Sequence, residues 1–241
     1  MARVREVPRN LCALRERIVR CRACARLVRH RERVAREKVR RFSDEEYCGR
    51  PLPGFGDPCA RLVLVGLAPA AHGGNRTGRM FTGDRSGDWL VGALHRAGFA
   101  NRPLSLGRDD GLELSDCYIT AAVRCAPPGN RPTRDEIERC RHFLLGELAC
   151  LRHVRVVVGL GRVGFDAALD AYRRLGRVEY ARKPAFAHAR VHRLGALTFI
   201  ASYHPSQQNT FTGKLTRPMF DRVFAKARRE LSRRSLGGDV E

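Results

Sequence analysis

The sequence lacks any apolar stretch close to the roughly 18 residues that cross a membrane. Its first ten residues, MARVREVPRN, also lack the apolar segment of a secretory signal. We therefore expect a cytoplasmic protein with no membrane partner. The 241 residues suffice for one large domain with a buried core.

Acidic residues and lysines are both scarce. The chain has 25 Asp and Glu against 46 Lys and Arg, four of them lysines, and a formal net charge of +21. Genome composition can explain arginine in place of lysine, but it does not explain the excess of bases over acids. Cationic side chains gain affinity for polyanions by releasing the counterions that phosphates condense. We therefore expect a nucleic-acid partner and association with the nucleoid.

Cysteine is frequent, but its pattern argues against disulfides. The nine cysteines are an odd number, and no export signal accompanies them. Cys21 and Cys24 lie about one helical turn apart and supply half of a metal site, and Cys125 and Cys140 would supply the other half. The long gap between the pairs does not match a compact zinc finger, so an iron–sulfur cluster fits better, with zinc left open. We expect the other five cysteines to be buried thiols, with Cys12 and Cys150 as the alternative ligands if one of the four is wrongly assigned.

Apolar strands alternate with amphipathic helices along most of the chain. This alternation predicts a parallel sheet with helices on both faces. Strands are expected at 61–65, 117–125, 154–161 and within 191–202, and helices at 86–97, 134–151, 162–176 and 216–234. Thr133 and Glu136 form a capping-box pattern that opens the second of these helices.

The two ends of the chain differ from this pattern. Residues 9–47 are rich in helix formers, with a possible interruption at the Cys21–Cys24 pair, and a Pro- and Gly-rich connector follows at 49–58. We predict one domain over 1–234, with an N-terminal helical metal-binding segment at about 9–48. The tail at 235–241 is expected to be disordered.

Three unusual loops follow the expected strands. They are GLAPAAHGG after 61–65, CAPPGN after 117–124 and YHPSQQN after 197–202. Ligands of open α/β sheets bind at the carboxyl ends of the strands, where such loops meet. The three loops together therefore predict a ligand site at one sheet edge.

The glycine-rich loop at 66–87 has no phosphate-binding motif, since it matches neither the Walker A nor the Rossmann spacing. Its glycines can serve tight turns, or they can let the backbone approach a ligand on which Phe81 stacks. Asp84 can be a helix cap or a functional acid, and Asp88 suits the first turn of the helix. His204 follows a strand end and could stabilise negative charge, although an isolated histidine is more often structural.

The segments GLAPAAHGGNRTGRMFTGDRSG, CAPPGNRPT and HPSQQNTFTG, in this order behind Cys-x2-Cys, resemble those of the family 5 (type B) uracil-DNA glycosylases. The resemblance extends from about Cys21 to Phe224. It implies a three-layer α/β/α sandwich with a central four-stranded parallel sheet. It also implies a monomeric, monofunctional DNA glycosylase that hydrolyses the N-glycosidic bond of uracil and other deaminated or damaged bases, hypoxanthine among them, to begin base-excision repair.

The same resemblance implies a [4Fe-4S] cluster on Cys21, Cys24, Cys125 and Cys140. It places catalysis on Asp84, His204 and Asn130, because the usual position of the water-activating residue holds Leu67 and Ala68 here. Substrate contacts are expected from Gly66, Leu67, Ala68, Ala70, His72, Phe81 and Ala121. DNA contacts are expected from Ser206, Gln207, Gln208 and Asn209.

One departure from the neighbouring family 4 bears on specificity. There an Asn that reads the edge of uracil precedes the motif VVKC, whereas this chain has Ala121 before Ala-Val-Arg-Cys. The missing amide favours a permissive pocket over a strict uracil enzyme of the family 4 kind. A non-catalytic nucleic-acid-binding iron–sulfur protein is the alternative from a different class.

Overall fold

The computed structural model describes residues 9–233, so the expected disordered tail at 235–241 lies outside the described residues. A mixed sheet of six strands forms the centre, in the order β1-β3-β2-β4-β6-β5. Its strands are β1 (Phe55–Gly56), β2 (Leu62–Gly66), β3 (Cys117–Ala121), β4 (Val156–Leu160), β5 (Val191–Leu194) and β6 (Leu197–Ser202). No helix within residues 9–233 is long and apolar enough to cross a membrane.

The four inner strands are parallel, which confirms the expected four-stranded core of the sheet. Strands β1 and β5 pair antiparallel at the two edges of the sheet. Strands were expected within 191–202, where β5 lies, but their antiparallel pairing was not predicted. Strand β1 lies in the stretch that we expected to be only a connector. It has two residues, too few to produce an alternating pattern in the sequence.

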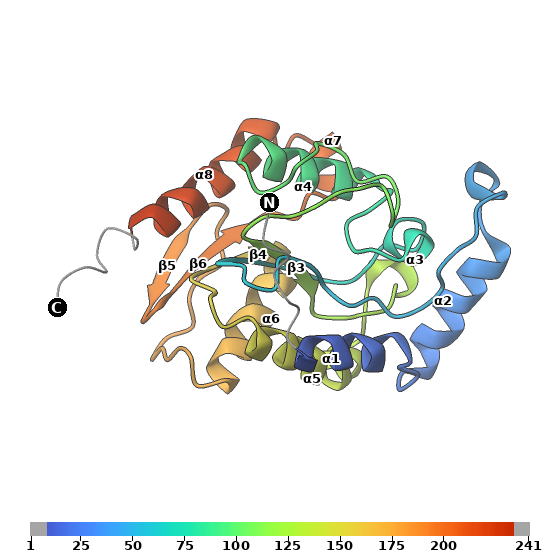
Figure 1. Ribbon diagram of the computed structural model, residues 1–241, viewed down its shortest axis with the longest axis horizontal. Helices are drawn as coiled ribbons and strands as arrows, with labels where there is room; N and C mark the ends of the chain where they lie inside the picture. Colours follow the sequence, from blue (N-terminus) through green and yellow to red (C-terminus); the bar gives the residue numbers. More distant parts are fainter. Residues whose placement is uncertain (1–8, 234–241) are drawn as a thin grey trace.

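Helices cover both faces of the sheet, as the alternating pattern predicts (Figure 1). The described α-helices are α1 (Arg9–Val19), α2 (Ala25–Glu37), α3 (Gly74–Thr77), α4 (Arg85–Arg96), α5 (Arg134–Cys150), α6 (Gly161–Arg174), α7 (Gln207–Phe211) and α8 (Arg217–Arg233). Two 3-10 turns, η1 (Arg40–Phe42) and η2 (Pro128–Asn130), complete the set. Helices α4 and α8 cover one face, and α1, α5 and α6 cover the other (Figure 1).

Successive strand residues face opposite layers, so the sheet divides two cores. Leu62 and Leu64 pack in the first core together with residues of α4 and α8, such as Leu90 and Phe224. Their neighbours in β2 face the second core, with residues of α5 and α6 such as Phe165. This two-sided burial explains why the parallel strands appear in the sequence as continuous apolar runs.

Two predicted elements are shorter in the structure. The expected strand 117–125 ends at Ala121, and the next two amide groups donate to the carbonyls of Gly66 and Leu67, at the end of β2 and just beyond it. The expected helical stretch 9–47 breaks between Val19 and Ala25 and ends at Glu37. The predicted capping box at Thr133 is confirmed at the start of α5.

A buried ion pair joins α5 to the end of the β3 segment. The guanidinium of Arg124 lies 2.9 Å from the carboxylate of Glu147, and both side chains are buried. The hydroxyl of Thr120 donates to that carboxylate at 2.6 Å, and the Gly54 amide donates to its other oxygen at 2.8 Å. Glu147 therefore binds three donors from two separate segments, the β3 segment and the connector at Gly54.

Removing the charge of Glu147 leaves the buried Arg124 cation without its counterion. We expect Glu147→Gln to lower the free energy of unfolding by about 3–5 kcal/mol, measured by urea denaturation. Glu138→Gln on the same helix removes an exposed partner of Arg141 and is expected to change it by less than about 1 kcal/mol. Equal effects of the two substitutions would contradict this account of the pair.

Candidate active site at the carboxyl edge of the sheet

The parallel strands bring the three predicted loops to the same edge of the sheet. Gly66 and Ala121 end neighbouring strands and pair in register. At the end of β4, Gly161 packs against His204, because a Cβ added to that glycine would lie 3.3 Å from the Cβ of His204. The convergence predicted from the chain order is therefore present in the structure.

Phe81 and His204 come together across this edge. Their ring centroids are 5.8 Å apart with an interplanar angle of 32°. A Cβ on Gly66 would lie only 2.9 Å from the Phe81 ring, so the ring lies directly over the end of β2. Phe81 also has a φ of 51°, in the left-handed region that aromatic residues avoid. Its surroundings must hold this conformation.

Asp84 caps α4, so the structural interpretation of this residue is confirmed. Its Oδ1 accepts a hydrogen bond from the Gly87 amide at 2.9 Å. The other oxygen rests against Gly73, where an added Cβ would approach Oδ2 to 1.9 Å. Burial raises the pKa of this carboxyl, and the amide groups of Gly87 and Ser86 partly offset the rise. The hydrogen bond that caps α4 is thus made by Oδ1, whereas Oδ2 faces Gly73.

His204 is neutral at physiological pH. Burial lowers the pKa of its imidazole to about 4. Its ring forms no hydrogen bond to another residue in the described part of the chain, while its carbonyl accepts from the Asn209 side chain at 2.9 Å. A neutral imidazole with an unused N–H can donate to an oxygen that becomes negative during a reaction.

The other predicted substrate contacts are apolar residues of the strand ends and the ring of His72. A partly buried apolar turn continues from Gly66 and contains Leu67, Ala68 and Ala70, and Ala121 is fully buried. The ring of His72 is already hydrogen-bonded to the hydroxyl of Tyr47 at 3.1 Å. The sequence alone gave no indication of this tyrosine.

Asn130 is not brought to the centre of the site. It lies exposed in η2 with a φ of 56°, and no contact joins it to Asp84 or His204 within residues 9–233. Ser206 caps α7 by accepting a hydrogen bond from the Asn209 amide at 3.4 Å. Gln207 and Gln208 are exposed on the first turn of that helix.

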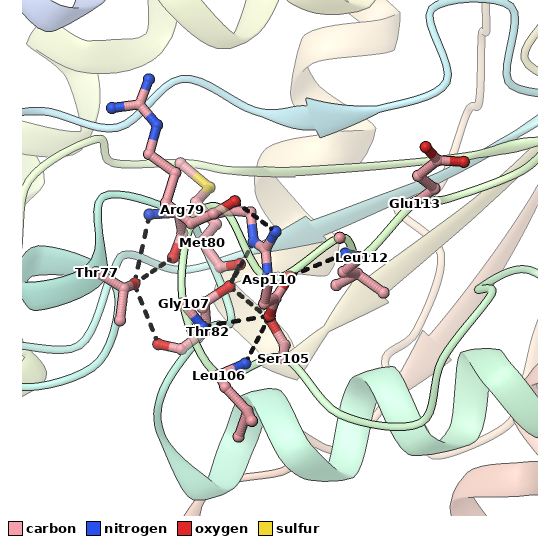
Figure 2. A network of polar contacts seen from close by, with 12 residues as sticks. Thr77, Arg79, Met80, Thr82, Ser105, Leu106, Gly107, Asp110, Leu112 and Glu113 are labelled. Atoms are coloured by element: carbon pink, nitrogen blue, oxygen red, sulfur yellow. Dashed lines mark hydrogen bonds and ion pairs between the residues drawn. The ribbon is translucent and has the colours of Figure 1, made fainter.

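A buried polar network that the sequence did not predict holds the loop around Phe81 (Figure 2). The guanidinium of Arg79 donates to Thr82, to Ser105 and to Asp110 at 2.8–3.0 Å. The amide of Gly83 donates to the Ser105 carbonyl at 2.8 Å. These contacts fix residues on both sides of Phe81 and account for its unusual backbone.

Asp110 anchors the far side of this network. Its carboxylate accepts from the amides of Leu106, Gly107 and Leu112 at 2.7–3.2 Å. Burial acts to raise the pKa of Asp110, but Arg79 and these amides outweigh it and hold the pKa at about 2. The carboxylate is therefore charged throughout the physiological range, and the loop 101–112 stays attached to the glycine-rich loop.

The four predicted cysteine ligands line a single small pocket between α2, α5 and the end of the β3 segment. Apolar side chains such as Leu27, Val123 and Phe143 complete its wall. The Arg124 amide donates to the Cys140 sulfur at 3.3 Å. A set of four thiols in an apolar wall with an amide donor fits an iron–sulfur cluster.

The thiols of Cys24, Cys125 and Cys140 carry raised pKa values, and burial is the main cause in each. Burial raises the pKa of Cys125 to about 12 and that of Cys140 to about 11. Within residues 9–233, no group of three or more His, Cys, Asp or Glu side chains has the geometry to hold a single metal ion. Of the five cysteines expected to be buried thiols, only Cys117 is fully buried, and Cys12 is exposed on α1.

Comparisons with known proteins match nearly the whole described chain. A family profile described as the uracil DNA glycosylase superfamily matches residues 53–228. The type-5 uracil-DNA glycosylase of Mycobacterium leprae is 52% identical over 211 residues, 87% of this chain and 90% of the relative. That of Thermus thermophilus is 50% identical over 212 residues, 87% and 93% of the two chains. A type-4 uracil-DNA glycosylase of Thermotoga maritima is 30% identical over 154 residues, 64% and 68% of the two chains.

The lowered pKa of His204 makes stability depend on pH. Between pH 6.5 and 4 the unfolded chain binds a proton that the folded imidazole rejects, so stability falls as the pH drops through this window. We expect this histidine to make the protein about 2 kcal/mol less stable at pH 5 than at pH 7.5, by chemical denaturation. His204→Gln should remove that difference, whereas the exposed His153→Gln should keep it. A wild-type-like pH dependence in His204→Gln would contradict the assignment.

Proposed function

The chain belongs to the uracil-DNA glycosylase superfamily, in its type-5 branch, and from that premise we propose that it removes uracil and other deaminated or damaged bases, including hypoxanthine, from DNA. Water cleaves the N-glycosidic bond, the base leaves, and the abasic site that remains starts base-excision repair. The observation that carries the proposal is the contact of Phe81 with a neutral His204 at the sheet edge where Asp84 caps α4.

The target base must leave the DNA stack to reach this edge. Unstacking and unpairing cost a few kcal/mol, and least for mispaired or damaged bases, which gives a first level of selection. The ring of Phe81 then offers a flat surface for the flipped base. Because its backbone is held by the Arg79 network, little order has to be acquired on binding.

The apolar first turn of the glycine-rich loop supports a broad range of bases. Leu67, Ala68 and Ala121 offer neither a donor nor an acceptor from their side chains that would select one base edge. Backbone amides at Gly66 to Ala70 can pair with several different bases. A pocket of this composition selects by shape and by ease of flipping.

The reaction separates charge, and two residues are positioned to respond. As the bond from C1′ to the base nitrogen breaks, negative charge develops on the base and positive charge on the sugar. The neutral imidazole of His204 donates a hydrogen bond to the base. Asp84 orients the attacking water through its second oxygen and accepts its proton, and its negative charge favours the sugar cation. Asn130 enters the proposal as a contact to the substrate strand, because its exposed side chain can reach a ligand.

Cys21, Cys24, Cys125 and Cys140 are proposed to hold a [4Fe-4S] cluster. The apolar pocket that these four thiols share supports the assignment. The cluster would supply a structural cross-link between the N-terminal segment and the core, with no redox step in the reaction. The residues themselves surround the sulfur atoms with apolar groups and an amide donor.

The excess of positive charge supports DNA as the partner. Arginine side chains hold phosphates without selecting sequence, and the QQNTF segment of α7, just after His204, is proposed to enter the duplex where the base has left. We include in the proposal that the protein acts as a monomer on chromosomal DNA in the cytoplasm.

The activity is tested with labelled duplexes that carry uracil, hypoxanthine or thymine opposite guanine, followed by alkaline cleavage of abasic sites. We expect product from uracil and from hypoxanthine. Asp84→Asn should slow single-turnover cleavage by about 10² or more, because the amide cannot accept the proton of water. Asp88→Asn, in the first turn of the same helix and exposed, is the matched control and should keep the wild-type rate.

Each proposal has its own negative outcome in this assay. No product from any duplex would overturn the glycosylase assignment. Product from uracil alone would overturn the broad base range and favour the strict uracil enzyme. An unchanged rate in Asp84→Asn would reduce Asp84 to a helix cap.

The cofactor is tested separately on the purified protein. We expect a brown colour with broad absorbance near ~400 nm and about four irons per chain. Cys140→Ser should remove both, because it deletes one of the four proposed ligands. Cys150→Ser, at the end of the same helix, should keep them. A colourless protein with stoichiometric zinc would contradict the cluster.

A further inference from the structure

We propose that the loop 101–112 is a second apolar DNA contact, in which Leu104 and Leu106 enter the opened duplex beside the excised base, across Asp84 from Phe211. The proposal rests on the proposed function, because it takes DNA with a displaced base as its partner. The loop 101–112 lies outside the three sequence motifs from which the site was predicted.

Three of the exposed large apolar side chains belong to segments that contact the residues next to Asp84. Five such residues occur within residues 9–233, with exposed fractions of 37% for Val39, 48% for Leu104, 62% for Leu106, 40% for Val163 and 68% for Phe211. A single exposed apolar residue is ordinary. Here Leu104, Leu106 and Phe211 lie on two segments that bond directly to the neighbours of Asp84 in the chain.

The first segment is attached to the residue before Asp84. Ser105 is fully buried between the two exposed leucines, and its carbonyl accepts from the Gly83 amide at 2.8 Å. Its hydroxyl lies 2.6 Å from that of Thr82 and accepts from Arg79 at 3.0 Å. Figure 2 shows Ser105 and Leu106 at the lower edge of this network, with the Leu106 side chain directed away from it.

The second segment is attached to the residue after Asp84. The guanidinium of Arg85 lies 4.2 Å from the ring centroid of Phe211 and donates to the Thr210 hydroxyl at 3.3 Å. Phe211 ends α7, which follows the His204 loop. Asp84, at the start of α4, therefore lies in the chain between a residue bonded to the loop of Leu104 and Leu106 and a residue bonded to α7, which carries Phe211.

Rigid attachment distinguishes the loop from an ordinary surface turn. Asp110 binds three of its backbone amides, and Arg79 donates to the Arg108 carbonyl at 3.0 Å as well as to Ser105 and Asp110. The polar anchor is buried while Leu104 and Leu106 stay exposed. Side chains fixed in this way lose little entropy when they enter a partner.

The chemistry of the loop fits DNA with an opened stack. Removing a base from the stack exposes apolar faces of its neighbours, and apolar side chains fill such gaps in proteins that kink or flip DNA. Arg102 and Arg108 flank the two leucines, are exposed and form no salt bridge with another described residue. Their charges are thus free to bind the phosphates on either side of the gap.

The test compares an abasic duplex, in which the missing base leaves a gap in the stack, with the corresponding single strand. Binding is measured by fluorescence anisotropy with a duplex containing a tetrahydrofuran abasic analogue and with the corresponding single strand. For the double variant Leu104→Ser/Leu106→Ser, we expect the preference for the duplex over the single strand to fall about tenfold, since only the duplex has a stack to refill. Val39→Ser, which removes an exposed apolar residue of the N-terminal segment, should keep the wild-type preference.

An unchanged duplex preference in the double variant would overturn the proposal, as would an equal loss for both DNA forms. Binding requires no excision, so the result is independent of the cleavage assay. A wild-type protein that binds the abasic duplex through the leucines but releases no base would contradict the proposed function and support the loop.

Discussion

The position of Phe81, and of the chain that leads from it to Asp84, depends on the guanidinium of Arg79. Arg79 belongs to the glycine-rich loop, and its buried guanidinium donates to four groups, Thr82, Ser105, Asp110 and the Arg108 carbonyl. The loop on one side contains Phe81 in a left-handed conformation, which has no intrinsic stability in an aromatic residue. The network offsets this strain, and Asp84 follows three residues after Phe81 at the start of α4. A planar group with five fixed donors is suited to such a junction, where lysine would offer a single flexible charge.

Much of the fold could be predicted because it rests on local signals. The apolar runs of the parallel strands and the capping box at Thr133 are contiguous in the chain, and both are confirmed. The end of β3 was placed wrongly, since Val123 and its neighbours are as apolar as the strand before them. There the amides after Ala121 bond to carbonyls at the start of the adjacent loop, a contact that no pattern in the sequence displays. The short edge strand β1 was missed for a similar reason.

The site was predictable to the extent that it lies in sequence motifs. Phe81 and Asp84 were expected from the glycine-rich loop and His204 from the loop after 197–202, and the structure brings Phe81 and His204 into contact. Asp110 was not expected, because it is distant from Arg79 in the chain and no spacing rule connects an arginine in one loop with an acid in another. The same holds for Tyr47 beside His72. Side-chain contacts between distant segments can be identified only when the positions of both segments in the structure are known.

The pocket of four cysteines has a consequence for the order of biosynthesis. Cys21 and Cys24 belong to the beginning of the chain, whereas Cys125 and Cys140 are made about a hundred residues later, which takes roughly 5–20 s at ordinary rates of chain elongation. During this interval the first two thiols have emerged without the other half of their pocket. They are then open to oxidation and to stray metal ions. The pocket can therefore assemble only after the chain has been extended past Cys140.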